Sequence, residues 1–270
     1  MLKTIRLAVA LPVAVASLLG ATPARAQNAD RALLATFCDA ASIKGATCKR
    51  TKGYPDAGQR GCDVTLSPDR ARGKFLASGN LLLVVNYDSG CESHATENGG
   101  VALFEEAGGK TVFRGFLPGE RINECVTLPK TAQQDDLVCL NGHIGQGVLE
   151  SSVALMNFSE DAGKHIKIAD DVLLTAEDAT GAYGTNVVTC KERSKVFELS
   201  KLAAGPRPAT VVVDASYADA DLIKTVCAKG FARPVEAVGD PAPGDAFVPD
   251  GREKNGKFVI DLTTRKVTPQ

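Results

Sequence analysis

The sequence contains no tryptophan, four tyrosines and three histidines, and it lacks the residue patterns that mark most hydrolases. A carbohydrate-binding surface built from stacked aromatic rings is therefore disfavoured. There is no Gly-x-Ser-x-Gly turn for a serine nucleophile and no His-Glu-x-x-His pair for a zinc peptidase. Glycine loops that bind phosphates or dinucleotides are absent as well. We therefore expect no catalytic residue set, no metal site and no cofactor.

Long blocks of one charge are also missing. The chain has 31 basic and 32 acidic residues, and three of the basic ones (Lys3, Arg6 and Arg25) precede residue 27, which leaves 28. Acidic and basic residues are mixed along the rest of the chain, so the sequence predicts no nucleic-acid footprint and no polybasic patch for a membrane surface. The expected partner is an unknown protein or a small molecule.

One apolar run stands out, and it lies at the N-terminus. Residues 7–19 are apolar except for Pro12 and Ser17, basic residues precede them, and Ala24-Arg25-Ala26 follows. These parts, in this order, are typical of a secretory signal peptide. A transmembrane helix needs about 20 apolar residues, and this run is shorter. We expect a signal peptide over 1–26, a periplasmic or secreted mature protein, and no membrane span after cleavage.

All eight cysteines follow the predicted signal peptide, at positions 38, 48, 62, 91, 125, 139, 190 and 227. An even number of cysteines in an exported chain indicates disulfides. No two of them have the Cys-x-x-Cys spacing of a structural zinc site, and a thiol enzyme would need an unpaired cysteine. The sequence therefore predicts a fold held together by disulfide bonds.

One disulfide can be predicted from strand geometry. If the segment between Cys125 and Cys139 folds as a hairpin centred on Ala132, the two cysteines lie directly opposite each other. Opposed residues on antiparallel strands have the Cβ separation that a disulfide needs. Local order along the chain suggests the remaining pairs Cys38–Cys48, Cys62–Cys91 and Cys190–Cys227.

The mature chain divides into two parts by residue pattern. Residues 27–79 combine a predicted helix over 30–41, where apolar residues recur at helical spacing, with a polar region that contains cysteines. Residues 80–270 alternate short β-prone runs with turn residues, which is typical of an antiparallel β domain. A second short helix is predicted over 217–229, and residues 233–251, with four prolines and three glycines, form a loop.

Within the second part, a strand–turn–strand unit recurs. It begins near residues 101, 153, 196 and 258. A unit of roughly 40 to 50 residues is typical of a β-propeller blade, because one small sheet cannot bury both of its faces alone. The mostly β fold is therefore predicted to be β-propeller-like, with a β-sandwich as the alternative.

The repeated strand, glycine-containing turn and second strand resemble the FG-GAP class of propeller repeats in exported bacterial proteins. Val101-Ala-Leu-Phe followed by Gly108-Gly-Lys-Thr-Val-Phe illustrates the unit, and the resemblance covers roughly 80–265. Members of that class often carry an Asp-x-Asp-x-Asp-Gly calcium loop. Asp214, Asp219 and Asp221 lack this pattern, so the resemblance does not imply calcium binding here.

Two polar segments are candidate ligand sites. Residues 86–100 and 141–150 occupy corresponding places in successive units, so blades would bring both to one end of the molecule, where repeat proteins bind ligands. The alternative is that both segments are solvated connections. The candidate ligand-binding residues are Asp88, Glu92, His94, Glu97, Asn98, Asn141, His143 and Gln146.

Three functions are compatible with these observations. The first is an exported, non-catalytic β protein that binds a ligand or partner. The second is an exported hydrolase with a carboxylate and histidine site in residues 86–100 and 141–150. The third is a structural component of the cell envelope, which an exposed apolar patch would favour.

Overall fold

The computed structural model describes residues 23–51, 61–89, 99–230 and 242–270, and these residues form sixteen strands, three α-helices and one 3-10 helix. None of the described helices has the length and apolar content that a bilayer span requires. The elements, in chain order, are α1 (Pro23–Leu34), η1 (Ala40–Ser42), β1 (Ile43–Lys44), β2 (Thr47–Thr51), β3 (Cys62–Gly73), β4 (Leu81–Ser89), β5 (Gly99–Ala107), β6 (Lys110–Pro118), β7 (Cys125–Pro129), β8 (Asp135–Gly145), β9 (Val148–Glu160), β10 (Ile166–Asp178), α2 (Thr180–Tyr183), β11 (Val187–Thr189), β12 (Ser194–Ala204), β13 (Thr210–Asp219), α3 (Ala220–Lys229), β14 (Asp245–Phe247), β15 (Lys254–Asp261) and β16 (Lys266–Pro269).

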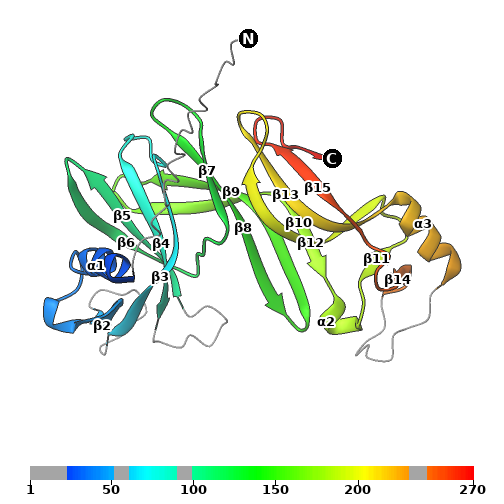
Figure 1. Cartoon of the computed structure of the whole chain (residues 1–270), viewed down its shortest axis with the longest axis horizontal. Coiled ribbons are helices and arrows are strands. Elements are labelled where there is room, and N and C mark those ends of the chain that lie inside the picture. Colours follow the sequence, from blue (N-terminus) through cyan, green and yellow to red (C-terminus); the bar gives the residue numbers. More distant parts are fainter. Residues whose placement is uncertain (1–22, 52–60, 90–98, 231–241) are drawn as a thin grey trace, which may run out of the picture.

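The strands form three large antiparallel sheets and one small one. The first sheet has the order β1-β2-β3-β4-β5-β6, the second β10-β9-β8-β7 and the third β12-β13-β15-β16, while β11 pairs with β14. Figure 1 shows the first sheet with α1 on one side of the molecule, the third sheet with α3 on the other, and the second sheet between them. The predicted mostly β, antiparallel fold is confirmed.

The middle of the second sheet is buried on both of its faces. Leu137 and Cys139 of β8 pack in one apolar cluster with Leu82 of the first sheet. Val138, the residue between them, packs in another cluster with Val213 of the third sheet. Because neighbouring residues of a strand point to opposite faces, a strand covered on both sides has a continuous apolar sequence. This explains the uninterrupted apolar run at 137–140.

The arrangement of the three large sheets does not confirm the predicted β-propeller. All four predicted strand–turn–strand units are hairpins, namely β5–β6, β9–β10, β12–β13 and β15–β16. The first and third sheets, however, pack on opposite faces of the second. The described residues therefore form an open stack of sheets, and the FG-GAP resemblance stays a prediction.

The predicted boundary between residues 79 and 80 lies inside the first sheet. Residues 62–73 form β3, residues 81–89 form β4, and these two strands pair with each other. The outer face of the same sheet packs against α1, through an apolar cluster that includes Leu34, Tyr87 and Phe104. The N-terminal region and the following strands thus share one core.

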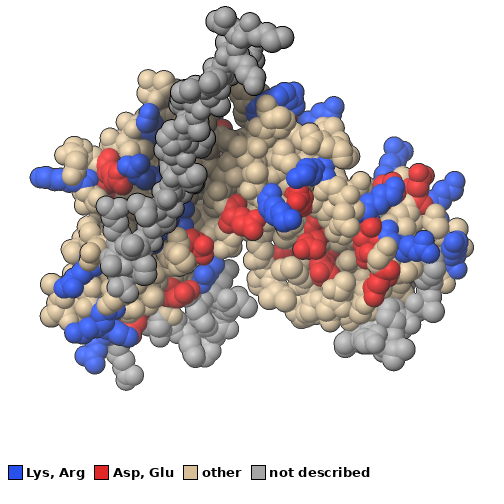
Figure 2. Space-filling model, in the orientation of Figure 1, with Lys and Arg blue, Asp and Glu red and all other residues tan. Residues whose placement is uncertain are grey.

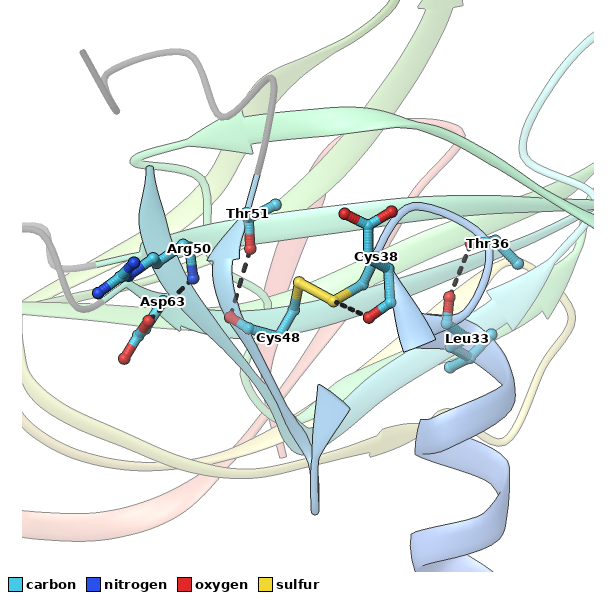
Figure 3. The surroundings of a disulfide bond; sticks show 8 residues. Leu33, Thr36, Cys38, Cys48, Arg50, Thr51 and Asp63 are labelled. Carbon is cyan, nitrogen blue, oxygen red and sulfur yellow. Dashed lines mark hydrogen bonds between the residues drawn. A yellow bond between two sulfur atoms is a disulfide. The ribbon is translucent and has the colours of Figure 1, made fainter. Parts of the chain in front are cut away.

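The first helix differs from its prediction over 30–41. It spans residues 23–34, and the chain then turns, with the Cys38 backbone N–H and the Thr36 hydroxyl donating hydrogen bonds to the carbonyls of Leu34 and Leu33. Cys38 is bonded to Cys48 in β2 (Figure 3). The disulfide attaches the turn that follows the helix to the first sheet.

Three predicted disulfides are confirmed: Cys38–Cys48, Cys125–Cys139 and Cys190–Cys227. Cys125 and Cys139 are direct partners in the β7–β8 ladder, as the hairpin argument predicts. Cys62 is also disulfide-bonded, and its predicted partner, Cys91, lies outside the described residues. Three intramolecular disulfides indicate that the protein matures in an oxidising environment.

The second predicted helix begins later than expected. It spans 220–229 rather than 217–229, because Tyr217 still pairs with Lys254 in the third sheet. The Asp219 side chain caps the helix by accepting a hydrogen bond from the Leu222 N–H, a typical N-cap. The four-residue helix α2 was not predicted. The predicted loop over 233–251 contains β14, while residues 231–241 are not described.

Candidate ligand-binding cleft

An open cleft of about 780 Å³ lies along the second sheet, beside the start of β12. Its lining comes from 141–143 of β8, 150–152 of β9, Val172 and 174–177 of β10, Glu192, and 194–196 of β12. Figure 1 shows the β8–β9 hairpin extending away from the first sheet towards α2. The cleft thus forms where the second sheet continues beyond the area that its neighbours cover.

The strand sequences change character at this point. In β8 the buried run 137–139 gives way to the half-buried Asn141 and then to exposed residues from Gly142 onward. In β9 the polar residues 150–152 precede the buried run 153–156. The sheet is therefore apolar where it is covered by the other sheets and polar where it lines the cleft.

Strand register arranges the polar residues in two cross-strand rows. Asn141 lies opposite Ser152, which lies opposite Thr175. Two residues further along β8, His143 lies opposite Glu150, which in turn lies opposite Glu177. Opposed residues and residues two apart share one face of an antiparallel sheet.

These six residues therefore present one polar face, which carries an amide, two hydroxyls, an imidazole and two carboxylates. The row between them consists of Gly142, Ser151 and Ala176. These small residues face the opposite side of the sheet and also line the cleft, which therefore reaches both faces of the sheet.

Asn141 has an unmet hydrogen-bonding capacity. Its side-chain oxygen Oδ1 is buried and accepts no hydrogen bond from the described residues. Its Nδ2 lies 3.9 Å from the sulfur of Met156, a weak acceptor. A buried oxygen without a donor costs about 1–3 kcal/mol.

The cleft is lined by more acidic than basic side chains. Lys195 Nζ lies 2.9 Å from Oε1 of Glu177 and forms an ion pair with it. Glu150 and Glu192 also line the cleft, and neither has an ion-pair partner within the described part of the chain. Glu150 lies directly opposite Glu177, and like charges in this relationship repel each other.

The predicted site residues are only partly brought together. Asn141 and His143 line the cleft, whereas Gln146 lies in the tight turn between β8 and β9, with a left-handed φ of 51°. Asp88 lies on β4, where it accepts a hydrogen bond from Arg121. Four further candidates, Glu92, His94, Glu97 and Asn98, lie outside the described residues.

The described residues of the two polar segments are mainly strand rather than loop. Residues 141–145 belong to β8 and 148–150 to β9, so the expected loop is one long hairpin. Residues 86–89 and 99–100 likewise belong to β4 and β5. Mixed polar residues were interpreted as a loop, but a strand that is solvated on both faces has no apolar alternation by which to recognise it.

Several cleft residues were not predicted, because no single stretch of sequence contains them. Ser151 and Ser152 precede an apolar strand, Thr175 follows one, and Lys195 opens β12. A signal for Ser151 and Ser152 exists in the polar run that directly precedes 153–156.

In the ranges that the structure describes, no group of three or more histidine, cysteine, aspartate or glutamate side chains is placed to hold a metal ion. The row of His143, Glu150 and Glu177 therefore does not form a metal site. Over the face shown in Figure 2, acidic and basic side chains are intermixed. Comparison of the chain with known protein families, curated proteins and solved structures gives no match.

Proposed function

We propose that this is an exported, non-catalytic binding protein, periplasmic or secreted, that holds a small polar ligand in the cleft of the second sheet. One observation carries the proposal. The two cross-strand rows present six hydrogen-bonding or charged side chains on one face of the sheet, all of them lining the same cleft. The volume of about 780 Å³ lies within the range typical of small-molecule sites.

The floor of the cleft supports binding, because it is preformed. Continuous backbone ladders β8–β9 and β9–β10 hold the rows in register. The same strands are anchored in two apolar clusters further along. The backbone that carries the cleft residues is therefore already ordered before a ligand arrives, which lowers the cost of association.

Export is supported by the predicted signal peptide together with the disulfides. A reducing cytoplasm would keep the thiols of Cys38, Cys48, Cys190 and Cys227 reduced. Fractionation of the native host, with a blot of each fraction, tests this part of the proposal. Most of the protein in the cytoplasmic fraction would contradict it.

Thermal unfolding with a panel of small metabolites tests the binding proposal. The panel contains cationic, neutral and anionic compounds of similar size. A ligand at roughly 100 times its Kd stabilises the folded protein by about 2.7 kcal/mol, which raises Tm by several degrees. We expect at least one compound to do so, and His143→Ala to weaken its binding.

A matched control separates the cleft from the rest of the surface. His165 is 80% exposed and lies outside the cleft lining, so His165→Ala should leave binding unchanged. If no compound raises Tm, or if binding survives both His143→Ala and Thr175→Val, the cleft is not a ligand site.

A second candidate function rests on one pair of residues. His143 and Glu150 lie directly opposite each other and are both exposed, an arrangement that a hydrolase could use for general acid–base catalysis. Incubation of the ligand identified above with the protein, followed by mass spectrometry, distinguishes the two functions. Recovery of intact ligand supports binding alone, and conversion that stops in His143→Ala supports the hydrolase.

A further inference from the structure

We infer that the ligand carries a primary ammonium group and that Glu150 binds this group. The inference rests on the proposed function, since it names the chemical class that the same cleft selects. It is carried by the charge balance of the cleft, by the pairing of Glu150 and Glu177 across the strands, and by the kinds of side chain that form the lining.

The cleft has an excess of negative charge. Glu150, Glu177 and Glu192 line it with a single lysine, Lys195. With histidine counted as neutral, two carboxylates remain unbalanced. An anionic ligand would be repelled by this arrangement, whereas a cation would be attracted.

Lys195 already forms an ion pair with Glu177, one of the two opposed carboxylates. Its side chain is 19% exposed and pairs with Glu177, so that carboxylate is already neutralised. The facing carboxylate of Glu150 lacks an ion-pair partner in the described ranges. A ligand cation beside Glu150 would complete an alternating set of charges and relieve the repulsion from Glu177.

The lining also distinguishes between kinds of cation. Of the described residues that line the cleft, none is phenylalanine, tyrosine or tryptophan. Quaternary ammonium groups have no N–H to donate and are bound in aromatic cages. A primary ammonium group has three N–H donors, and the cleft lining offers acceptors of the matching kind in Glu150, Ser152 and Thr175.

A matched set of three probes tests the inference by isothermal titration calorimetry at pH 7 and low salt. The probes are 1,5-diaminopentane, its bis(trimethylammonium) analogue and 1,5-pentanediol, which share a carbon chain and differ in the end groups. We expect the diamine to bind at least tenfold more tightly than either analogue.

The variant Glu150→Gln should weaken diamine binding about tenfold or more, since it replaces a charge-assisted hydrogen bond with a neutral one. Glu253→Gln is the matched control, because Glu253 lies outside the cleft lining. Circular dichroism melts show whether each variant is folded. Glu150→Gln should melt no lower than the parent protein, since it removes a repulsive contact.

The outcomes separate the two proposals. Tighter binding of the diol or of the quaternary analogue, or equal binding of the diamine to Glu150→Gln, overturns the inference. If a neutral or anionic metabolite from the thermal panel binds in the cleft while the diamine does not, the inference fails and the proposed function stands. If nothing in the probe set or the panel binds, both fail.

Discussion

Asn86 and Ile122 exchange two hydrogen bonds in the interior of the protein. The side-chain Nδ2 of Asn86 donates to the Ile122 carbonyl at 2.6 Å, and the Ile122 N–H donates to Oδ1 of Asn86 at 3.0 Å. Both residues are at most 2% exposed. Ile122 lies in the connection between β6 and β7, so this pair fixes the chain where it passes from the first sheet to the second.

Asn86→Leu should strongly destabilise the protein. It leaves two buried backbone groups of Ile122 without partners, each costing about 1–3 kcal/mol, so we expect the free energy of unfolding to fall by about 2–6 kcal/mol. Urea denaturation measures this change. Asn157→Ala, at an exposed strand position, should change the same quantity by less than about 0.5 kcal/mol.

Arg114 should contribute to the contact between the first two sheets. Its guanidinium forms ion pairs with Glu105 and Glu160 and donates to the Lys164 carbonyl. The Arg114 and Glu105 side chains are each only 13% exposed. Arg114→Met leaves the Glu105 carboxylate without its cation, and removing one partner of a buried ion pair costs about 3–5 kcal/mol.

Because these groups are not fully buried, the cost should lie at or below the lower end of that range. We expect urea denaturation to show a free energy of unfolding about 2–3 kcal/mol lower for Arg114→Met than for the parent protein. The double variant Arg114→Met/Glu105→Gln should recover part of that loss, since the uncompensated charge is gone. A double variant less stable than Arg114→Met would show that the charge of Glu105 is not the cause.

The Cys125–Cys139 disulfide should stabilise the second sheet by constraining the unfolded chain. The two residues are 14 positions apart, and closing a loop of this size contributes about 3 kcal/mol. The double variant Cys125→Ala/Cys139→Ala should lower the free energy of unfolding by about that amount. Cys190→Ala/Cys227→Ala, which opens a 37-residue separation, should cost slightly more. An unchanged midpoint in both variants would contradict the chain-entropy argument.

Acid should weaken the end of the third sheet through Asp219. A hydrogen bond from Lys254, together with the backbone N–H of Leu222, lowers the pKa of this carboxyl below its ordinary value of 3.8. A carboxyl whose folded-state pKa is lowered stabilises the fold above its unfolded-state pKa, and loses that contribution as the pH falls towards the folded-state value.

We therefore expect unfolding free energy to decrease below about pH 4, and Asp219→Asn to reduce the slope of that decrease. An asparagine still caps the helix but no longer titrates. Urea denaturation at pH values between 6 and 2.5 provides the measurement. An identical acid slope in both proteins would rule out Asp219 as a contributor.

Local sequence was sufficient to predict the hairpins and one disulfide register. The strand–turn–strand unit that begins near residue 153 and the turn between Cys125 and Cys139 depend on residues close in the chain, and the structure has the predicted pairing in both. The four-residue helix α2 has no comparable pattern. Its placement depends on a close backbone contact, because a Cβ on Gly181 would lie 2.5 Å from the Gly147 carbonyl oxygen.

The cleft could be predicted only in part. Asn141 and His143 were found because they lie in one short polar segment, but Thr175 and Lys195 come from other strands. Which part of a strand becomes a site depends on where the neighbouring sheets stop covering it. The packing of the first and third sheets on the second determines where this cover ends. The periodicity of apolar residues along the sequence does not predict that position.

The central claim is that the polar rows of the second sheet bind a ligand. Heteronuclear NMR of the labelled protein, titrated with 1,5-diaminopentane, tests it most directly. We predict that the backbone amides of Gly142, Glu150, Ser152 and Thr175 shift together and saturate with one Kd. Shifts confined to other parts of the chain, or no saturable shift at these amides with the diamine or with any ligand from the thermal panel, would contradict the claim.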